Sequence, residues 1–177
     1  MGRLSTAFGR IPSRLRVLGF ATFLAVLGAV ILAVTPDAAV SPERAWTLPF
    51  FAVVIAFGAA EATALHVEIR KQSHSLSLSG VVLVFGVLHL SPTLLALSYV
   101  LGAAPAMIWV RKADWVKTTW NVSLFFAEAA LAALIVRSVL GMDFPSTAAE
   151  WAVPLLAMLA AELMSLVAVP LVIMASD

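Results

Sequence analysis

The sequence contains an uncharged apolar run of 18 residues, Val17 to Val34, and further long apolar segments follow it. A transmembrane helix needs about 20 mainly apolar residues to cross the hydrocarbon core of a bilayer. Of the 177 residues, 62% are hydrophobic and 12% are charged, and the mean hydropathy is +1.03. One water-soluble core cannot bury so much apolar surface. We therefore predict an all-α integral membrane protein.

The N-terminal segment carries four arginines before the first apolar run, which is the order of charge and hydrophobicity found in a signal peptide. However, the 18-residue run is longer than the usual apolar region of a signal peptide, and more apolar segments come after it. We therefore interpret residues 1–14 as a cytoplasmic tail and residues 15–34 as the first span.

Charges and prolines divide residues 15–177 into six apolar segments that form a single transmembrane domain. The third segment is short, and only Ser91-Pro92 separates it from the fourth. A turn at this dipeptide would give two antiparallel spans. The sequence predicts a bundle of about six transmembrane helices, at about 15–34, 46–67, 77–90, 92–110, 118–139 and 151–175.

The positions of lysine and arginine predict the orientation, because cytoplasmic loops retain positive charge during insertion. With six spans and the N-terminus inside, only Arg44 and Arg137 of the 11 basic residues face outward. Joining the third and fourth spans would move Arg111, Lys112 and Lys117 to the outside. We therefore expect both termini in the cytoplasm, with the other basic residues on that side: Arg3, Arg10, Arg14, Arg16, Arg70, Lys71, Arg111, Lys112 and Lys117.

Several functional classes lack their sequence signatures. The formal net charge is only +1, which gives no reason to expect a nucleic-acid partner. There is no cysteine, and the chain has no phosphate-binding loop, nucleophile elbow or metalloprotease helix. An intramembrane hydrolase that uses Glu61 or Glu128 has no positive support. We therefore expect a chain that is not an enzyme and binds no metal or cofactor.

Ionisable side chains are costly inside a bilayer, so Glu61, Glu128 and Glu162 are candidate ligand-binding or coupling residues. Glu128 and Glu162 lie near the middle of their spans, and Glu61 lies in the inner half of the second span. On the fifth span a polar stripe shares one helix face. The stripe is either a ligand or proton path, or a set of hydrogen bonds that fixes helix packing, and its members are Lys117, Asn121, Phe125 and Glu128.

The predicted second span ends in a polar cluster in which Glu61 and Glu68 share a helix face and His66 approaches Arg70. The cluster is either a pH-sensitive hinge or ordinary solvated charge at the inner membrane interface. One histidine among glutamates lacks the ligand spacing of a metal site.

Polar and apolar residues alternate with period two from Ser73 to Gly80, which favours an extended segment leading into the third span. Extended backbone cannot face lipid unpaired, so other helices or a wet cavity must shield it. The serines could also cap the following helix. We expect this segment to move or to bind a ligand, with Ser75, Ser77 and Ser79 as its candidate residues.

Small residues recur at four-residue spacing on several predicted helices, which allows close helix approach. The pattern fits either packing within one chain or a homodimer seam, and it comprises Ala21, Ala25, Ala29 and Ala33, Gly102 with Ala106, and Ala157 with Ala161.

Three segments within about residues 60–130 form a further pattern: His66 to Ser79, Val81 to Pro92, and Lys117-x-x-x-Asn121. Together they resemble the N-terminal multi-helix membrane region of bacterial diguanylate cyclases and cyclic-di-GMP phosphodiesterases, which carry GGDEF or EAL domains. Two positions depart from that pattern: Gly80 stands where an acidic residue is common, and Trp120 stands where phenylalanine is common.

The resemblance implies a membrane region that senses a signal or positions the protein, while cytoplasmic domains make or degrade the second messenger. Since the sequence ends at Asp177, it implies either a membrane portion of a longer protein or a relative with a separate output partner. We therefore expect a non-enzymatic sensory or anchoring module in the bacterial inner membrane. The alternatives are a small transporter that uses the intramembrane glutamates and an inert membrane anchor or dimerisation element.

Overall fold

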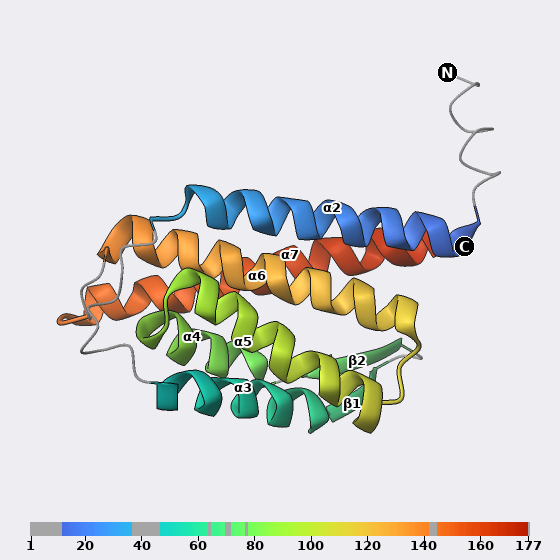
Figure 1. Ribbon diagram of the computed structural model, residues 1–177, viewed down its shortest axis with the longest axis horizontal. Coiled ribbons are helices and arrows are strands. Elements are labelled where there is room, and N and C mark those ends of the chain that lie inside the picture. Colours follow the sequence, from blue (N-terminus) through green and yellow to red (C-terminus); the bar gives the residue numbers. More distant parts are fainter. Residues whose placement is uncertain are drawn as a thin grey trace, which may run out of the picture.

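The structure is a computed structural model that describes residues 12–36, 47–63, 65–69, 72–76, 78–141 and 145–176. Helices account for nearly all of these residues, and one short β-hairpin interrupts them (Figure 1). In chain order the elements are α2 (Ser13–Val34), α3 (Thr47–Ala62), β1 (Leu65–Ile69), β2 (Gln72–Leu76), α4 (Ser79–His89), α5 (Pro92–Pro105), the π-helical turn η1 (Ala106–Val110), α6 (Trp115–Leu140) and α7 (Ala148–Ser176).

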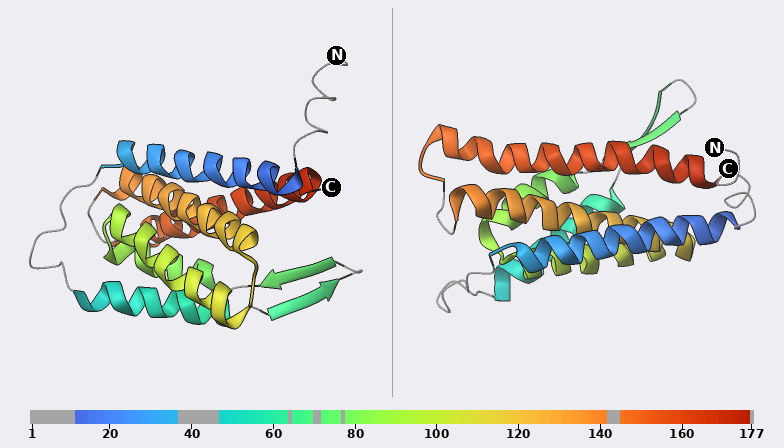
Figure 2. Two further views of the ribbon diagram at one scale, coloured as in Figure 1. Left: turned by 45° about the vertical axis from the view of Figure 1, so that its right-hand side comes forward. Right: turned by 90° about the horizontal axis from the view of Figure 1, so that it is seen from above.

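Helix α6 lies at the centre of the bundle and contacts α2, α4, α5 and α7 (Figures 1 and 2). Half of its most apolar window is buried, against 17% for α2 and α7. The hairpin lies at the end of the bundle where α2 and α6 begin and where α3 and α7 end, which we call the hairpin end. The opposite end holds the turn between α4 and α5.

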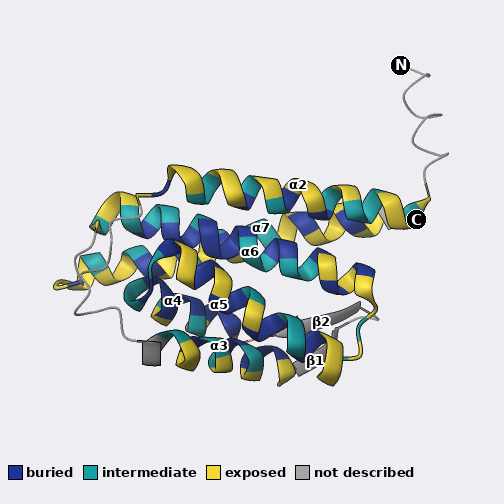
Figure 3. Cartoon of the chain, in the orientation of Figure 1, coloured by how far each residue is buried: buried dark blue, intermediate teal, exposed yellow. Residues whose placement is uncertain are grey.

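Four helices of the described segments are long and apolar enough to cross a membrane: α2, α5 together with η1, α6 and α7. Their outer faces expose large apolar side chains, such as Phe23 at 62% and Leu166 at 67% (Figure 3). Continuous apolar faces of this extent are unfavourable in water and suit a hydrocarbon environment. The fold is therefore that of a helical bundle suited to a membrane.

The predicted second span, 46–67, is too long, because α3 ends at Ala62. In its last turn the Thr63 hydroxyl donates to the carbonyl oxygen of Ala59 at 2.7 Å. The chain then enters β1, which pairs antiparallel with β2 from Leu65 opposite Leu76 to Ile69 opposite Gln72. The ladder satisfies backbone groups of both strands, so the helix need not continue.

The predicted third span, 77–90, corresponds to α4, which has 11 residues. At 1.5 Å per residue α4 is about 16 Å long, roughly half the thickness of a hydrocarbon core. Its separation from α5 occurs at the predicted dipeptide: the Ser91 hydroxyl caps α5 by accepting from the backbone N–H of Leu94, and Pro92 occupies the first turn.

Small residues permit the closest helix contacts in the bundle. A Cβ added at Gly102 on α5 would overlap the backbone of α3, including the carbonyl oxygen of Val54 and the nitrogen of Gly58 at 2.9 Å. The buried residues of α2 are Ala21, Leu24 and Gly28, so of the predicted stripe of four alanines only Ala21 is buried. Alanines 157 and 161 are buried within the chain, at 0% and 2% exposure.

The substitution Gly102→Ala should force α3 and α5 apart and lower the free energy of unfolding by about 1–3 kcal/mol, the usual cost of overpacking. The matched control is Gly19→Ala on α2, where an added Cβ meets nothing within 4 Å. Thermal unfolding in detergent micelles measures both. Equal midpoints for the two variants would contradict the close contact between α3 and α5.

Candidate functional site

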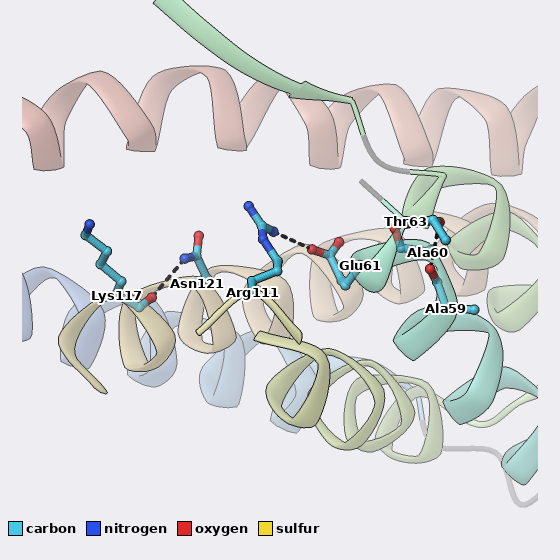
Figure 4. A network of polar contacts seen from close by, with 7 residues as sticks. All are labelled: Ala59, Ala60, Glu61, Thr63, Arg111, Lys117 and Asn121. Atoms are coloured by element: carbon cyan, nitrogen blue, oxygen red, sulfur yellow. Dashed lines mark hydrogen bonds and ion pairs between the residues drawn. The ribbon is translucent and has the colours of Figure 1, made fainter. Parts of the chain in front are cut away.

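An ion pair joins α3 to the segment after η1. The Arg111 guanidinium donates from Nη1 to Oε2 of Glu61 at 3.1 Å (Figure 4). The Glu61 side chain is 3% exposed and that of Arg111 is 25% exposed. A carboxylate this deeply buried is tolerated only with a compensating charge or hydrogen bonds. The pair therefore fixes the end of α3 against the connection between α5 and α6.

The π-helical turn η1 places Arg111 for this contact. Pro105 lacks a backbone N–H and ends the α-helical hydrogen-bond pattern of α5. The backbone N–H of Arg111 then donates to the carbonyl oxygen of Ala106 at 3.0 Å, five residues back. Such wide turns are rare and often occur at functional sites. Here the turn reaches the residue that pairs with Glu61.

A second polar group lies deeper in the bundle, on α5. The ring of Tyr99 stacks between Phe57 on α3 and Phe125 on α6, with centroid distances of 4.0 Å and 4.7 Å. Its hydroxyl shares a hydrogen bond with Ser79, the first residue of α4. Tyr99 is only 2% exposed. The aromatic stack therefore holds one hydroxyl rigidly at the point where α4 begins.

Tyr99 interacts electrostatically with three carboxyl groups, first with that of Glu128 and less strongly with those of Glu61 and Glu162. Glu128 is 6% exposed and occupies the middle of α6, where the Ser165 hydroxyl of α7 is its hydrogen-bond partner. Glu128 also interacts electrostatically with Glu162 and Glu61. All three glutamates therefore converge, although they come from three different helices.

The side chain of Glu162, on α7, lies beside the beginning of α4. Its Oε1 lies 3.3 Å from the position that a Cβ at Gly80 would occupy, and the Met158 sulfur lies 3.0 Å from it. The chain has glycine at position 80, where the family pattern commonly has an acidic residue. The Glu162 carboxyl group nevertheless lies beside this position.

We call this cluster the polar core. It consists of the buried residues Glu61, Ser79, Tyr99 and Glu128, the partly exposed Arg111 and Ser165, and Glu162, which is exposed at its edge. It contains three carboxyl groups and one guanidinium. Nearby carboxylates repel one another unless a proton or another cation compensates them. In the described segments no group of three histidine, aspartate or glutamate side chains has the geometry to hold a metal ion. The three carboxyl groups outnumber the one guanidinium, so the cluster carries an excess of acidic groups that a proton or another cation would compensate.

The other predicted residues are placed elsewhere. Lys117 is 74% exposed, and Asn121 donates from Nδ2 to the Lys117 carbonyl oxygen at 2.8 Å (Figure 4). Of the predicted stripe on α6, only the inner members Phe125 and Glu128 take part in the contacts around Tyr99. His66 and Glu68 lie on β1, so their predicted helical relations to Glu61 and Arg70 are wrong. Ser75 lies on β2, and Arg70 and Ser77 lie outside the described residues.

Sequence reasoning missed three members of the polar core. Tyr99 is the single tyrosine of the chain, which is a signal in an otherwise apolar segment. Arg111 was counted only as a cytoplasmic charge, and Ser165 has no distinguishing neighbours. The comparisons with protein families, curated proteins and solved structures give no match. The resemblance to cyclic-di-GMP signalling proteins therefore stays a prediction.

Replacing Arg111 by glutamine should lower the free energy of unfolding by about 3 kcal/mol, because it removes the cation that faces a buried carboxylate. The double variant Glu61→Gln with Arg111→Gln should recover part of this loss, since it leaves no buried charge there. Lys117→Gln is the matched control, because its side chain is 74% exposed. Unfolding in detergent measures all three, and equal stability of Arg111→Gln and Lys117→Gln would refute a stabilising pair.

Proposed function

We propose that this chain is a non-enzymatic membrane sensory module of a bacterial signalling protein. The observation that carries the proposal is the Glu61–Arg111 pair, which joins the polar core to the connection between η1 and α6 at the hairpin end of the bundle. A change of charge inside the core therefore acts directly on a segment at the surface of the bundle. The predicted resemblance to cyclic-di-GMP proteins supports the same class.

The signal would change the balance of charge among the three glutamates. Protons or cations that bind between Glu128 and Glu162 reduce their repulsion, and this alters how strongly Glu61 attracts Arg111. Arg111 follows a π-helical turn and precedes α6, so its displacement moves the start of the central helix. A cytoplasmic output domain or protein would read this movement.

We also propose that the six helices cross or enter the bacterial inner membrane with the hairpin end in the cytoplasm. The connection between η1 and α6 lies at this end with the start of α6, and these segments contain Arg111, Lys112 and Lys117, as positive-inside loops do. The beginning of α2 and the end of α7 lie at the same end, which agrees with both termini in the cytoplasm.

The absence of cysteine allows a direct test of this orientation, because one introduced thiol is the only one present. In intact cells a membrane-impermeant maleimide should label Ala148→Cys, at the start of α7, and leave Ala113→Cys unlabelled. Both should react after the membrane is permeabilised. The reverse pattern would invert the orientation, and labelling of both in intact cells would rule out an inner location for the hairpin end.

To test sensing, a diguanylate cyclase domain is joined after Asp177 and cyclic-di-GMP is measured in cells while external pH and cation concentration are varied. We expect the output to depend on these conditions. Glu128→Gln should reduce that dependence by about tenfold or more, since it removes an ionisable group from the core.

The matched control is Glu150→Gln, because Glu150 lies at the start of α7, where its Oε2 accepts from the backbone N–H of Ser146 at 2.6 Å. This residue lies at the end of the bundle opposite the hairpin, and its substitution should leave the response unchanged. An output that is constant under all conditions, or that is preserved when an unrelated six-span region replaces this chain, would indicate an inert anchor instead.

The convergence of the three glutamates also favours a second candidate, a small proton-coupled or cation-coupled transporter. Purified chain in lipid vesicles would then carry proton or sodium flux, detected with an internal pH dye or a sodium dye. Flux that Glu128→Gln abolishes and Glu150→Gln preserves would support transport. Absence of proton and sodium flux in vesicles that contain correctly folded chain would support the sensory proposal.

A further inference from the structure

A groove of about 390 Å³ lies at the hairpin end, between the beginnings of α2 and α6 and the last turns of α7. Its floor is apolar: Trp120 is 6% exposed and Val172 is 9% exposed, and Val17 packs against the hydrophobic cluster to which both belong. All three helices are long and apolar enough to cross a membrane. The groove therefore lies where such helices leave the hydrocarbon and meet the headgroups.

The rim of the groove is cationic. Arg14 and Lys117 line it from α2 and α6, and both are exposed. The single carboxylate of the lining, Asp114, already caps α6 by accepting from the backbone N–H of Lys117 at 3.0 Å. Its other contact with Lys117 is a distant ion pair, with 3.9 Å between Nζ and Oδ2. Two cations against one engaged carboxylate leave a positive rim.

One further lining residue points to the same kind of ligand. Trp115 lines the groove with 60% of its surface exposed. Tryptophan is enriched at the headgroup level of membranes, where its ring contacts both lipid and water.

We propose that this groove binds one anionic phospholipid of the adjacent leaflet. The phosphate lies between the side chains of Arg14 and Lys117, where cations recognise it by charge-assisted hydrogen bonds. One acyl chain covers the exposed apolar side chains of the lining, Trp115 at 60% and Ile173 at 55% exposure. A soluble phosphate would satisfy the rim but would leave these two side chains exposed. The site is independent of the sensory proposal, because it requires only that α2, α6 and α7 lie in a bilayer.

Native mass spectrometry of the purified full chain in detergent tests the site with phosphatidylglycerol as the probe. We expect one bound phosphatidylglycerol, with phosphatidylcholine at equal concentration binding at least fivefold more weakly. Arg14→Gln and Lys117→Gln should each weaken phosphatidylglycerol binding by about fivefold, the usual effect of one basic residue at a lipid surface.

Lys112→Gln is the matched control. Lys112 is an exposed cation in the connection between η1 and α6, and it does not line the groove. It should leave the bound fraction unchanged, and inorganic phosphate should not compete. Equal binding of both lipids, or equal losses in all three variants, would overturn a specific site. If inorganic phosphate displaced phosphatidylglycerol at a concentration equal to that of the lipid, the proposal of a lipid site would be overturned. The groove would then be a site for a soluble anion.

Discussion

The arrangement of this bundle depends on one electrostatic constraint, the burial of Glu61 opposite Arg111. A carboxylate that is 3% exposed is unfavourable unless charge or hydrogen bonds compensate it. The π-helical turn η1, which follows Pro105 at the end of α5, places Arg111 beside the end of α3 and so permits this pair. Helix packing through Gly102 and Gly58 sets the distance between α3 and α5. It does not set the position of Arg111 relative to Glu61.

Much of the fold could be predicted from the sequence, because membrane helices need long uncharged runs and end near charges and prolines. The helix beginning at Ser13 and the break at Ser91-Pro92 follow from these signals. The end of α3 could not be predicted, since residues 63–67 remain apolar enough to continue a helix. The helix ends because the following residues form β1, which pairs with β2. The free energy of this pairing depends on two strands together, so the local sequence pattern of either strand does not indicate it.

The candidate site was predictable only in its charges. Glu61, Glu128 and Glu162 stand out because carboxyl groups are rare in apolar helices, but their convergence depends on how three helices pack. Tyr99 could not be assigned, because its hydrogen bond to Ser79 depends on α4 beginning in the middle of the bundle. Lys117 and Asn121 were predicted to belong to the site but do not. Their helical spacing correctly places them on one face of α6 with Glu128, but they lie nearer the surface than Glu128 does.

The short length of α4 has a consequence for the shape of the bundle. Since α4 is about 16 Å long, it adds cross-sectional area to one half of the bundle and little to the other. The half of the bundle that contains α4 therefore has one more helix in cross-section than the hairpin end. This change in cross-section falls at the start of α4, where Ser79 contacts Tyr99 of the polar core.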